Sequence, residues 1–151
     1  IYYGVIFLSF GSTTFEYRNL VMKNNASGYE LYKWSNSKLN EDDVLITTHR
    51  SNALSNVKTI PGNFLYYIRP DNKNAKKYFE EIKKLKPNYM LFYEDKKNFN
   101  YFKNCLGELK YYQKSVGRQT PRNPLKKSEF FYDGYIYELN YKKLPDCLFN
   151  Q

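Results

Sequence analysis

The chain has little cysteine, histidine and tryptophan, which limits the chemistry available to it. Its 151 residues include two Cys, one His and one Trp. Cys105 and Cys147 are too far apart for a Cys-x-x-Cys metal or redox motif, and neither has His as a neighbour in sequence. We therefore expect no metal site, no Cys-His nucleophile and no cofactor. The two cysteines fit a disulfide in an oxidising compartment and equally fit two buried free thiols.

The common nucleotide and nucleophile motifs are also missing. No Gly-x-Gly-x-x-Gly or Gly-x-x-x-x-Gly-Lys-[Ser/Thr] loop is present, which disfavours an ordinary dinucleotide or nucleotide site. There is no Gly-x-Ser-x-Gly elbow and no signature of an RNP motif, a helix-turn-helix or a zinc finger. These absences weaken the case for an autonomous enzyme, and whether the chain carries an active site stays open.

Acidic residues are fewer than basic ones, 15 against 24, so the net charge is +9. Residues 96–151 hold eleven basic and five acidic side chains and thus most of the excess, +6. A basic surface can meet anionic lipid headgroups, phosphate-bearing substrates or nucleic acid. An ordinary solvated surface without a partner explains the same excess of basic residues.

The first ten residues, Ile1–Phe10, are uncharged and largely apolar, whereas the remainder has the composition of a water-soluble domain. Ten residues fall short of the roughly 20 that span a bilayer as a helix, but they suit the last half of such a helix. An apolar first strand is the alternative. We favour the helix end because the later strands make a sheet without it. Residues 1–14 are then an apolar stub with a linker, and residues 15–151 form one α/β domain.

Three continuous apolar runs, Val44–Thr48, Phe64–Ile68 and Tyr89–Tyr93, predict strands covered on both faces. A turn at Asp133-Gly134 and an antiparallel edge strand over Tyr135–Leu139 are predicted near the end. Helical spacing or capping residues predict helices over residues 15–22, 27–38, 53–56, 71–85 and 99–114. The alternation predicts a three-layer, Rossmann-like α/β fold with a mostly parallel sheet.

Ser27 and Glu30 have capping-box spacing at the start of the second helix, and Trp34 is assigned to its buried side. Polar residues follow each of the three parallel strands, where ligands bind in open α/β sheets. These candidates for binding a small anionic ligand are His49, Arg50, Ser51, Arg69, Asp71 and Glu94. The arginines suit a phosphate or carboxylate, and His49 beside Asp71 or Glu94 suits a general base. Polar loops that merely cap helices give the same pattern.

A second candidate site is the basic, proline-punctuated loop over residues 117–124, together with the two lysines that follow it. Arg118, Arg122, Lys126 and Lys127 could hold an anionic chain, with nearby Tyr and Phe for stacking. Nucleic acid is the less favoured partner, because Tyr is common throughout the chain instead of being concentrated near these cations.

The apolar start, the segment Tyr29–Trp34, the segment Leu39–Ile46 and the closing Tyr135–Leu139 together suggest a family. In this order they resemble the soluble C-terminal region of polytopic GT-C-type glycosyltransferases, which use lipid-linked sugars. The resemblance implies a compact domain that follows the last membrane helix outside the cytoplasm. It also implies that the catalytic acids lie in the membrane part, so no catalytic residue is assigned here.

On this resemblance, the domain is a non-catalytic accessory whose partners are the membrane part of the same polypeptide and a lipid-phosphate sugar or acceptor glycan. The expected location is membrane-attached and extracytoplasmic, either periplasmic or at the cell surface. If Ile1–Phe10 is a strand, the cytoplasm is expected instead. The sequence leaves the sugar, the acceptor and the oligomeric state open.

Overall fold

The computed structural model describes residues 15–47, 52–61, 73–93, 96–119 and 130–149. The apolar stretch Ile1–Phe10 and the predicted strand Phe64–Ile68 lie outside these ranges. Within them, no helix is both long enough and apolar enough to cross a membrane.

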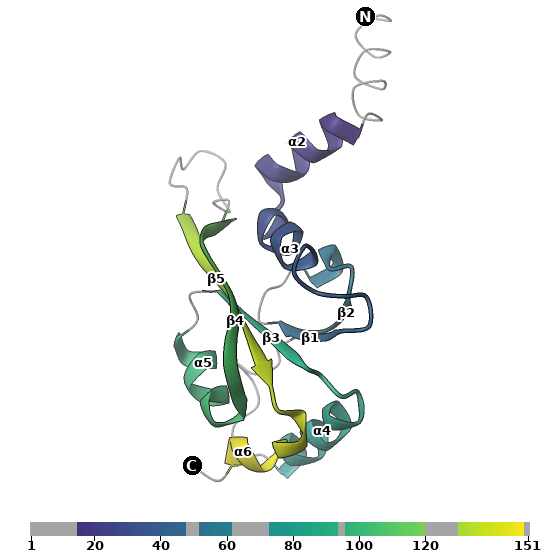
Figure 1. Ribbon diagram of the computed structural model, residues 1–151, viewed down its shortest axis with the longest axis vertical. Coiled ribbons are helices and arrows are strands. Elements are labelled where there is room, and N and C mark those ends of the chain that lie inside the picture. Colours follow the sequence, from purple (N-terminus) through teal and green to yellow (C-terminus); the bar gives the residue numbers. More distant parts are fainter. Residues whose placement is uncertain (1–14, 48–51, 62–72, 94–95, 120–129, 150–151) are drawn as a thin grey trace, which may run out of the picture.

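The described residues form a mixed α/β fold around a five-stranded sheet in the order β2-β1-β3-β5-β4 (Figure 1). The strands are β1 (Val44–Thr47), β2 (Lys58–Pro61), β3 (Tyr89–Tyr93), β4 (Leu106–Gln119) and β5 (Phe130–Leu139). β1 pairs in parallel with β2 and β3, while β5 pairs antiparallel with both β3 and β4. Four strands therefore run in one direction, as the prediction of a mostly parallel α/β sheet requires.

Five helices flank this sheet among the described residues: α2 (Phe15–Asn25), α3 (Tyr29–Asn36), α4 (Lys73–Lys84), α5 (Lys96–Phe102) and α6 (Asp146–Phe149). Single 3-10 turns lie at η1 (Asn52–Leu54), η3 (Lys103–Cys105) and η4 (Tyr141–Lys143). α2, α3 and α4 confirm three of the predicted helices. The predicted capping box is wrong, because the residue that caps the start of α3 is Gly28, in the left-handed region (φ 81°), and no side chain caps this end.

The C-terminal half departs most from the prediction. The expected helix over residues 99–114 is wrong, because α5 ends at Phe102 and β4 begins at Leu106. Asp133 and Gly134 form no turn and lie inside β5. β5 is also no edge strand, because β4 covers its outer side. Pairing between two long strands has overridden the helical spacing.

Apolar side chains cover both faces of the sheet, since neighbours along a strand point to opposite sides. On one face, Ile46 and Met90 pack in a cluster that includes residues of α4, α5 and α6. On the other, Leu45 and Leu91 pack in a cluster with residues of α3. This double burial explains why β1 and β3 are continuously apolar in sequence.

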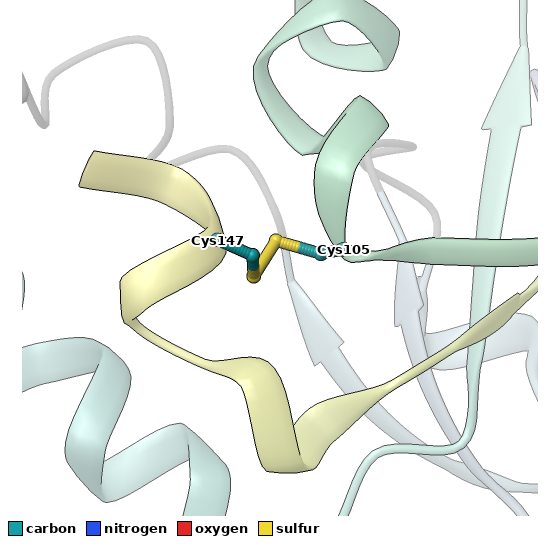
Figure 2. Close-up of a disulfide and its surroundings, with 2 residues drawn as sticks. All are labelled: Cys105 and Cys147. Atoms are coloured by element: carbon teal, nitrogen blue, oxygen red, sulfur yellow. A yellow bond between two sulfur atoms is a disulfide. The ribbon is translucent and has the colours of Figure 1, made fainter. Parts of the chain in front are cut away.

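Two ends of the molecule differ (Figure 1). One end consists of α2, α3 and the adjoining tips of β4 and β5; these elements border a groove. We call it the groove end, and we call α4, α6 and η3 the disulfide end. At the disulfide end, Cys105 is bonded to Cys147 across a Cα–Cα distance of 5.3 Å. Figure 2 shows this bond joining the end of η3, just before β4, to α6. The disulfide settles the alternative that the sequence left open.

Candidate functional site

Most of the predicted site residues cannot be placed. His49, Arg50, Ser51, Arg69, Asp71 and Glu94 all lie outside the described residues, as do Arg122, Lys126 and Lys127. The strand-end site therefore stays a prediction. Arg118 is the one member of either candidate set that the described ranges contain, and it lies near the end of β4.

Arg118 lines a groove of ≈ 660 Å³ between α3 and the paired strands β4 and β5. The ionisable side chains that line it are Lys23, Glu30, Lys33, Lys114 and Arg118. Two aromatic side chains, Trp34 and Phe131, also line it. Four cations against one carboxylate give the groove a positive potential, and its aromatic surfaces are accessible from the same hollow.

Trp34 approaches β5 closely because residue 134 has no side chain. A Cβ on Gly134 would lie 2.7 Å from Cζ3 of Trp34 and 2.8 Å from Cγ1 of Val116. Both distances are shorter than any ordinary carbon–carbon contact. Gly134 therefore lets α3 pack onto the sheet with its tryptophan half-buried at the groove. Among the described residues, the buried Nε1 of Trp34 has no hydrogen-bond partner, which is uncommon for a buried donor.

A second glycine shapes the β4–β5 pair beside the groove. A Cβ on Gly117 would lie 1.8 Å from Cε2 of Tyr132, so the tyrosine ring occupies the space that any other residue would fill. Tyr132 is buried and also meets the ring of Tyr93 at a centroid distance of 5.1 Å. The strand that carries Arg118 is thus held against the core.

Asp133 fixes the irregular part of β4 that forms the groove wall. The pairing of β4 with β5 shifts register between Gln113 and Gly117, and Ser115 has a φ of 51° there. The Asp133 carboxylate accepts a hydrogen bond from the Ser115 backbone N–H at 2.7 Å and from the Tyr112 hydroxyl at 2.9 Å. The bulge directs Lys114, Ser115 and Val116 into the groove lining.

These hydrogen bonds change two pKa values. The Ser115 N–H, and then the Tyr112 hydroxyl, lower the pKa of Asp133 below its usual range, because both stabilise the charged carboxylate. The same carboxylate raises the pKa of Tyr112. Asp133 is therefore ionised at neutral pH and accepts the hydrogen bonds that fix the bulge.

α2 contributes Lys23 to the groove and is connected to α3 by a short link. The Tyr29 hydroxyl of α3 donates a hydrogen bond to Oδ1 of Asn19 on α2, at 2.7 Å. Gly28, with its positive φ, allows the abrupt change of direction between the two helices. Side chains of four elements, α2, α3, β4 and β5, thus line one groove.

The groove suits the binding of an anion next to a ring. Lysine and arginine side chains supply charge and hydrogen-bond donors for phosphate or carboxylate oxygens. Trp34 and Phe131 offer flat apolar faces. In the part of the chain that is described, no cluster of three or more His, Cys, Asp or Glu side chains could hold a metal ion.

Sequence reasoning found Arg118 but missed the other groove residues. Trp34 was assigned to the buried side of its helix, whereas the structure leaves it half-buried at the groove. The adjacent basic and aromatic residues Lys33-Trp34 were the available signal. The sequence around Lys114 gave no such signal, because that segment was predicted to be helical.

The fold and the groove together define a mixed α/β domain with a basic, aromatic-lined groove. The chain belongs to the family described as the DUF1420 C-terminal domain, whose model matches residues 23–150. All the residues that line the groove lie within the matched range. No curated protein and no solved structure gives a significant match.

Proposed function

We propose that this chain is a non-catalytic, extramembrane accessory domain of a membrane glycosyltransferase that uses lipid-linked sugars. In this proposal the groove binds the phosphate-bearing part of the lipid-linked sugar. The observation that carries it is the grouping of four cations and a tryptophan around one groove. The accessory role and the GT-C relationship rest on the sequence resemblance.

The chemistry of such a ligand fits the groove. A sugar pyrophosphate carries several negative charges beside a ring whose C–H faces are apolar. Lys33, Lys114 and Arg118 can bind the phosphate oxygens, and the planar guanidinium can bind two of them at once. The exposed part of the Trp34 indole can pack on the sugar ring.

Two further observations support a location outside the cytoplasm and a connection to a longer chain. Disulfides persist mainly in oxidising compartments, and Cys105 and Cys147 form one here. The matched family is described as a C-terminal domain, which agrees with a role at the end of a longer polypeptide.

The sole tryptophan makes the groove testable without a label, because emission excited beyond tyrosine absorption reports on Trp34 alone. We expect saturable changes in this emission on titration with geranyl pyrophosphate or with a polyprenyl-pyrophosphate sugar in detergent. The double variant Lys33→Gln/Lys114→Gln should bind at least about tenfold more weakly, because each lost charged hydrogen bond is worth over 1 kcal/mol.

The matched control is Lys76→Gln/Lys77→Gln, which removes the same charge from exposed positions of α4 at the disulfide end. Equal weakening by both double variants would show attraction to net charge alone and would refute a groove site. Tighter binding of single-stranded oligonucleotides than of either pyrophosphate would favour nucleic acid as the ligand instead.

The accessory role needs the whole polypeptide. In the full-length transferase, Lys33→Gln/Lys114→Gln should raise KM for the lipid-linked donor and leave kcat nearly unchanged, since the groove binds but performs no chemistry. A large fall in kcat with KM unchanged would contradict a purely accessory domain.

A further inference from the structure

The groove end exposes apolar side chains that the proposed binding of a sugar phosphate does not explain. The four most exposed large apolar residues among those described are Phe15 (77%), Leu20 (54%), Phe130 (52%) and Phe131 (51%). The first two lie on α2 and the other two at the start of β5. Soluble surfaces rarely gather such residues without a partner.

These two elements lie at the same end of the molecule. Lys23 of α2 and Phe131 of β5 line the same groove, and Figure 1 shows α2 and the tip of β5 at one end with α4 and α6 at the other. Leu20 lies on the same side of α2 as Lys23, one turn earlier, and Phe130 adjoins Phe131, so these residues border the groove. Phe15 lines a separate hollow with Leu54 and Asn56.

The charge of this surface indicates what covers it. The charged residues described on α2, α3 and the outer parts of β4 and β5 are Glu16, Arg18, Lys23, Glu30, Lys33, Lys114, Arg118 and Asp133. Five are basic and three are acidic. Aromatic and aliphatic side chains flanked by Lys and Arg are typical of surfaces that rest on anionic bilayers, where apolar groups enter the headgroup region and cations meet phosphates.

We propose that the groove end docks on an anionic membrane surface, with Leu20, Phe130 and Phe131 entering the interface. Docking would place the groove beside the lipid headgroups. The inference does not need the groove to bind a sugar phosphate, because plain lipid vesicles suffice to test it.

Tryptophan quenching by brominated lipid tests this orientation directly. In the full chain with Trp34→Phe, a tryptophan is placed by Phe131→Trp at the groove end or by Leu85→Trp just after α4, where Leu85 is 41% exposed. On vesicles of brominated phosphatidylcholine and phosphatidylglycerol, we expect strong quenching of the tryptophan at position 131 and little at position 85. Similar quenching at both positions, or none at position 131 while the chain sediments with vesicles, would overturn the proposal.

Co-sedimentation of the full chain measures the contribution of the exposed side chains. Leu20→Gln/Phe130→Gln should weaken partitioning onto the same mixed vesicles roughly tenfold, because each removes apolar surface worth about 1 kcal/mol or more at the interface. The matched control Leu85→Gln should leave partitioning unchanged, and both variants should keep the wild-type urea midpoint.

Two other outcomes would overturn the proposal. Partitioning that Leu20→Gln/Phe130→Gln leaves unchanged would mean that other parts of the chain hold it to the vesicle. Concentration-dependent dimers that this variant abolishes, without a change in vesicle binding, would mean that a second copy covers the surface. Failure of the pyrophosphate titration with quenching still confined to position 131 would refute the proposed function and leave the docking surface intact.

Discussion

The disulfide end and the groove end of this domain differ in whether their aromatic side chains are packed together or exposed. At the disulfide end, Phe79 meets Phe102 and Phe149 edge to face, and the Cys105–Cys147 bond ties two elements together. At the groove end, aromatic side chains are exposed and basic residues gather around a hollow. The contrast indicates that cross-linking and aromatic packing are concentrated at one end, whereas the other exposes apolar and basic side chains.

Removing the disulfide should have the largest effect on stability. The bond closes a loop with a sequence separation of 42 residues, for which the chain-entropy relation gives about 4 kcal/mol. Cys105→Ala/Cys147→Ala should lower the free energy of unfolding by about that amount in urea titrations. Trp34 emission in the native state should stay unchanged. A shifted native emission would show that the surroundings of Trp34 depend on the disulfide, and would contradict the separation of roles between the two ends.

Gly117→Ala should be the most damaging single substitution at the groove end. Its Cβ would overlap the ring of the buried Tyr132, and overpacking of this kind costs about 3 kcal/mol. The measurement is again the urea midpoint. Gly107→Ala is the matched control in the same strand, because its Cβ would lie 3.2 Å from the nearest atom, in the side chain of Glu138. Equal losses from both would mean that the Tyr132 contact is not the cause.

Acid should loosen the groove wall before it unfolds the molecule. The folded pKa of Asp133 is depressed, so its stabilising effect is complete above the ordinary aspartate pKa of 3.8 and is lost as the pH falls through the lower folded pKa. The Ser115 amide should then lose its hydrogen bond, visible as an NMR shift below about pH 4. Asp133→Asn should remove that acid-dependent shift. Its persistence in the variant would assign the effect to another group.

Lys84→Gln should have the smallest effect. Lys84 pairs with Glu81 at 2.7 Å on α4, but their side chains are 68% and 59% exposed. Solvated pairs of this kind contribute about 0.3 kcal/mol, so the urea midpoint should hardly move. A loss above about 1 kcal/mol would show that exposed charges matter even at the disulfide end.

The central strands and the main helices could be predicted from local pattern alone. β1 and β3 are continuously apolar because both faces of the sheet are covered, and α3 carries a helical stripe led by Leu31. In these segments the local preference and the tertiary environment agree.

The groove could not be predicted because its parts depend on contacts distant in sequence. Leu106 and Leu109 have helical spacing, but pairing with β5 makes their segment a strand. Asp133-Gly134 has the composition of a turn, yet the carboxylate holds a bulge in β4 and the glycine admits Trp34. The structural role of each of these residues depends on a partner distant in sequence, which the local pattern does not reveal.

The strand order has a consequence for biosynthesis. α3, near the start of the chain, packs on β4 and β5, which end at Leu139. During translation, β1 can cover part of the apolar side of α3 early, but the contacts of Leu31 with β5 must wait for about a hundred further residues to leave the ribosome, which takes several seconds at ordinary elongation rates. A helix that emerges early and is fully buried only late is a natural point of contact for chaperones, so truncation of the last third would leave part of its apolar side uncovered.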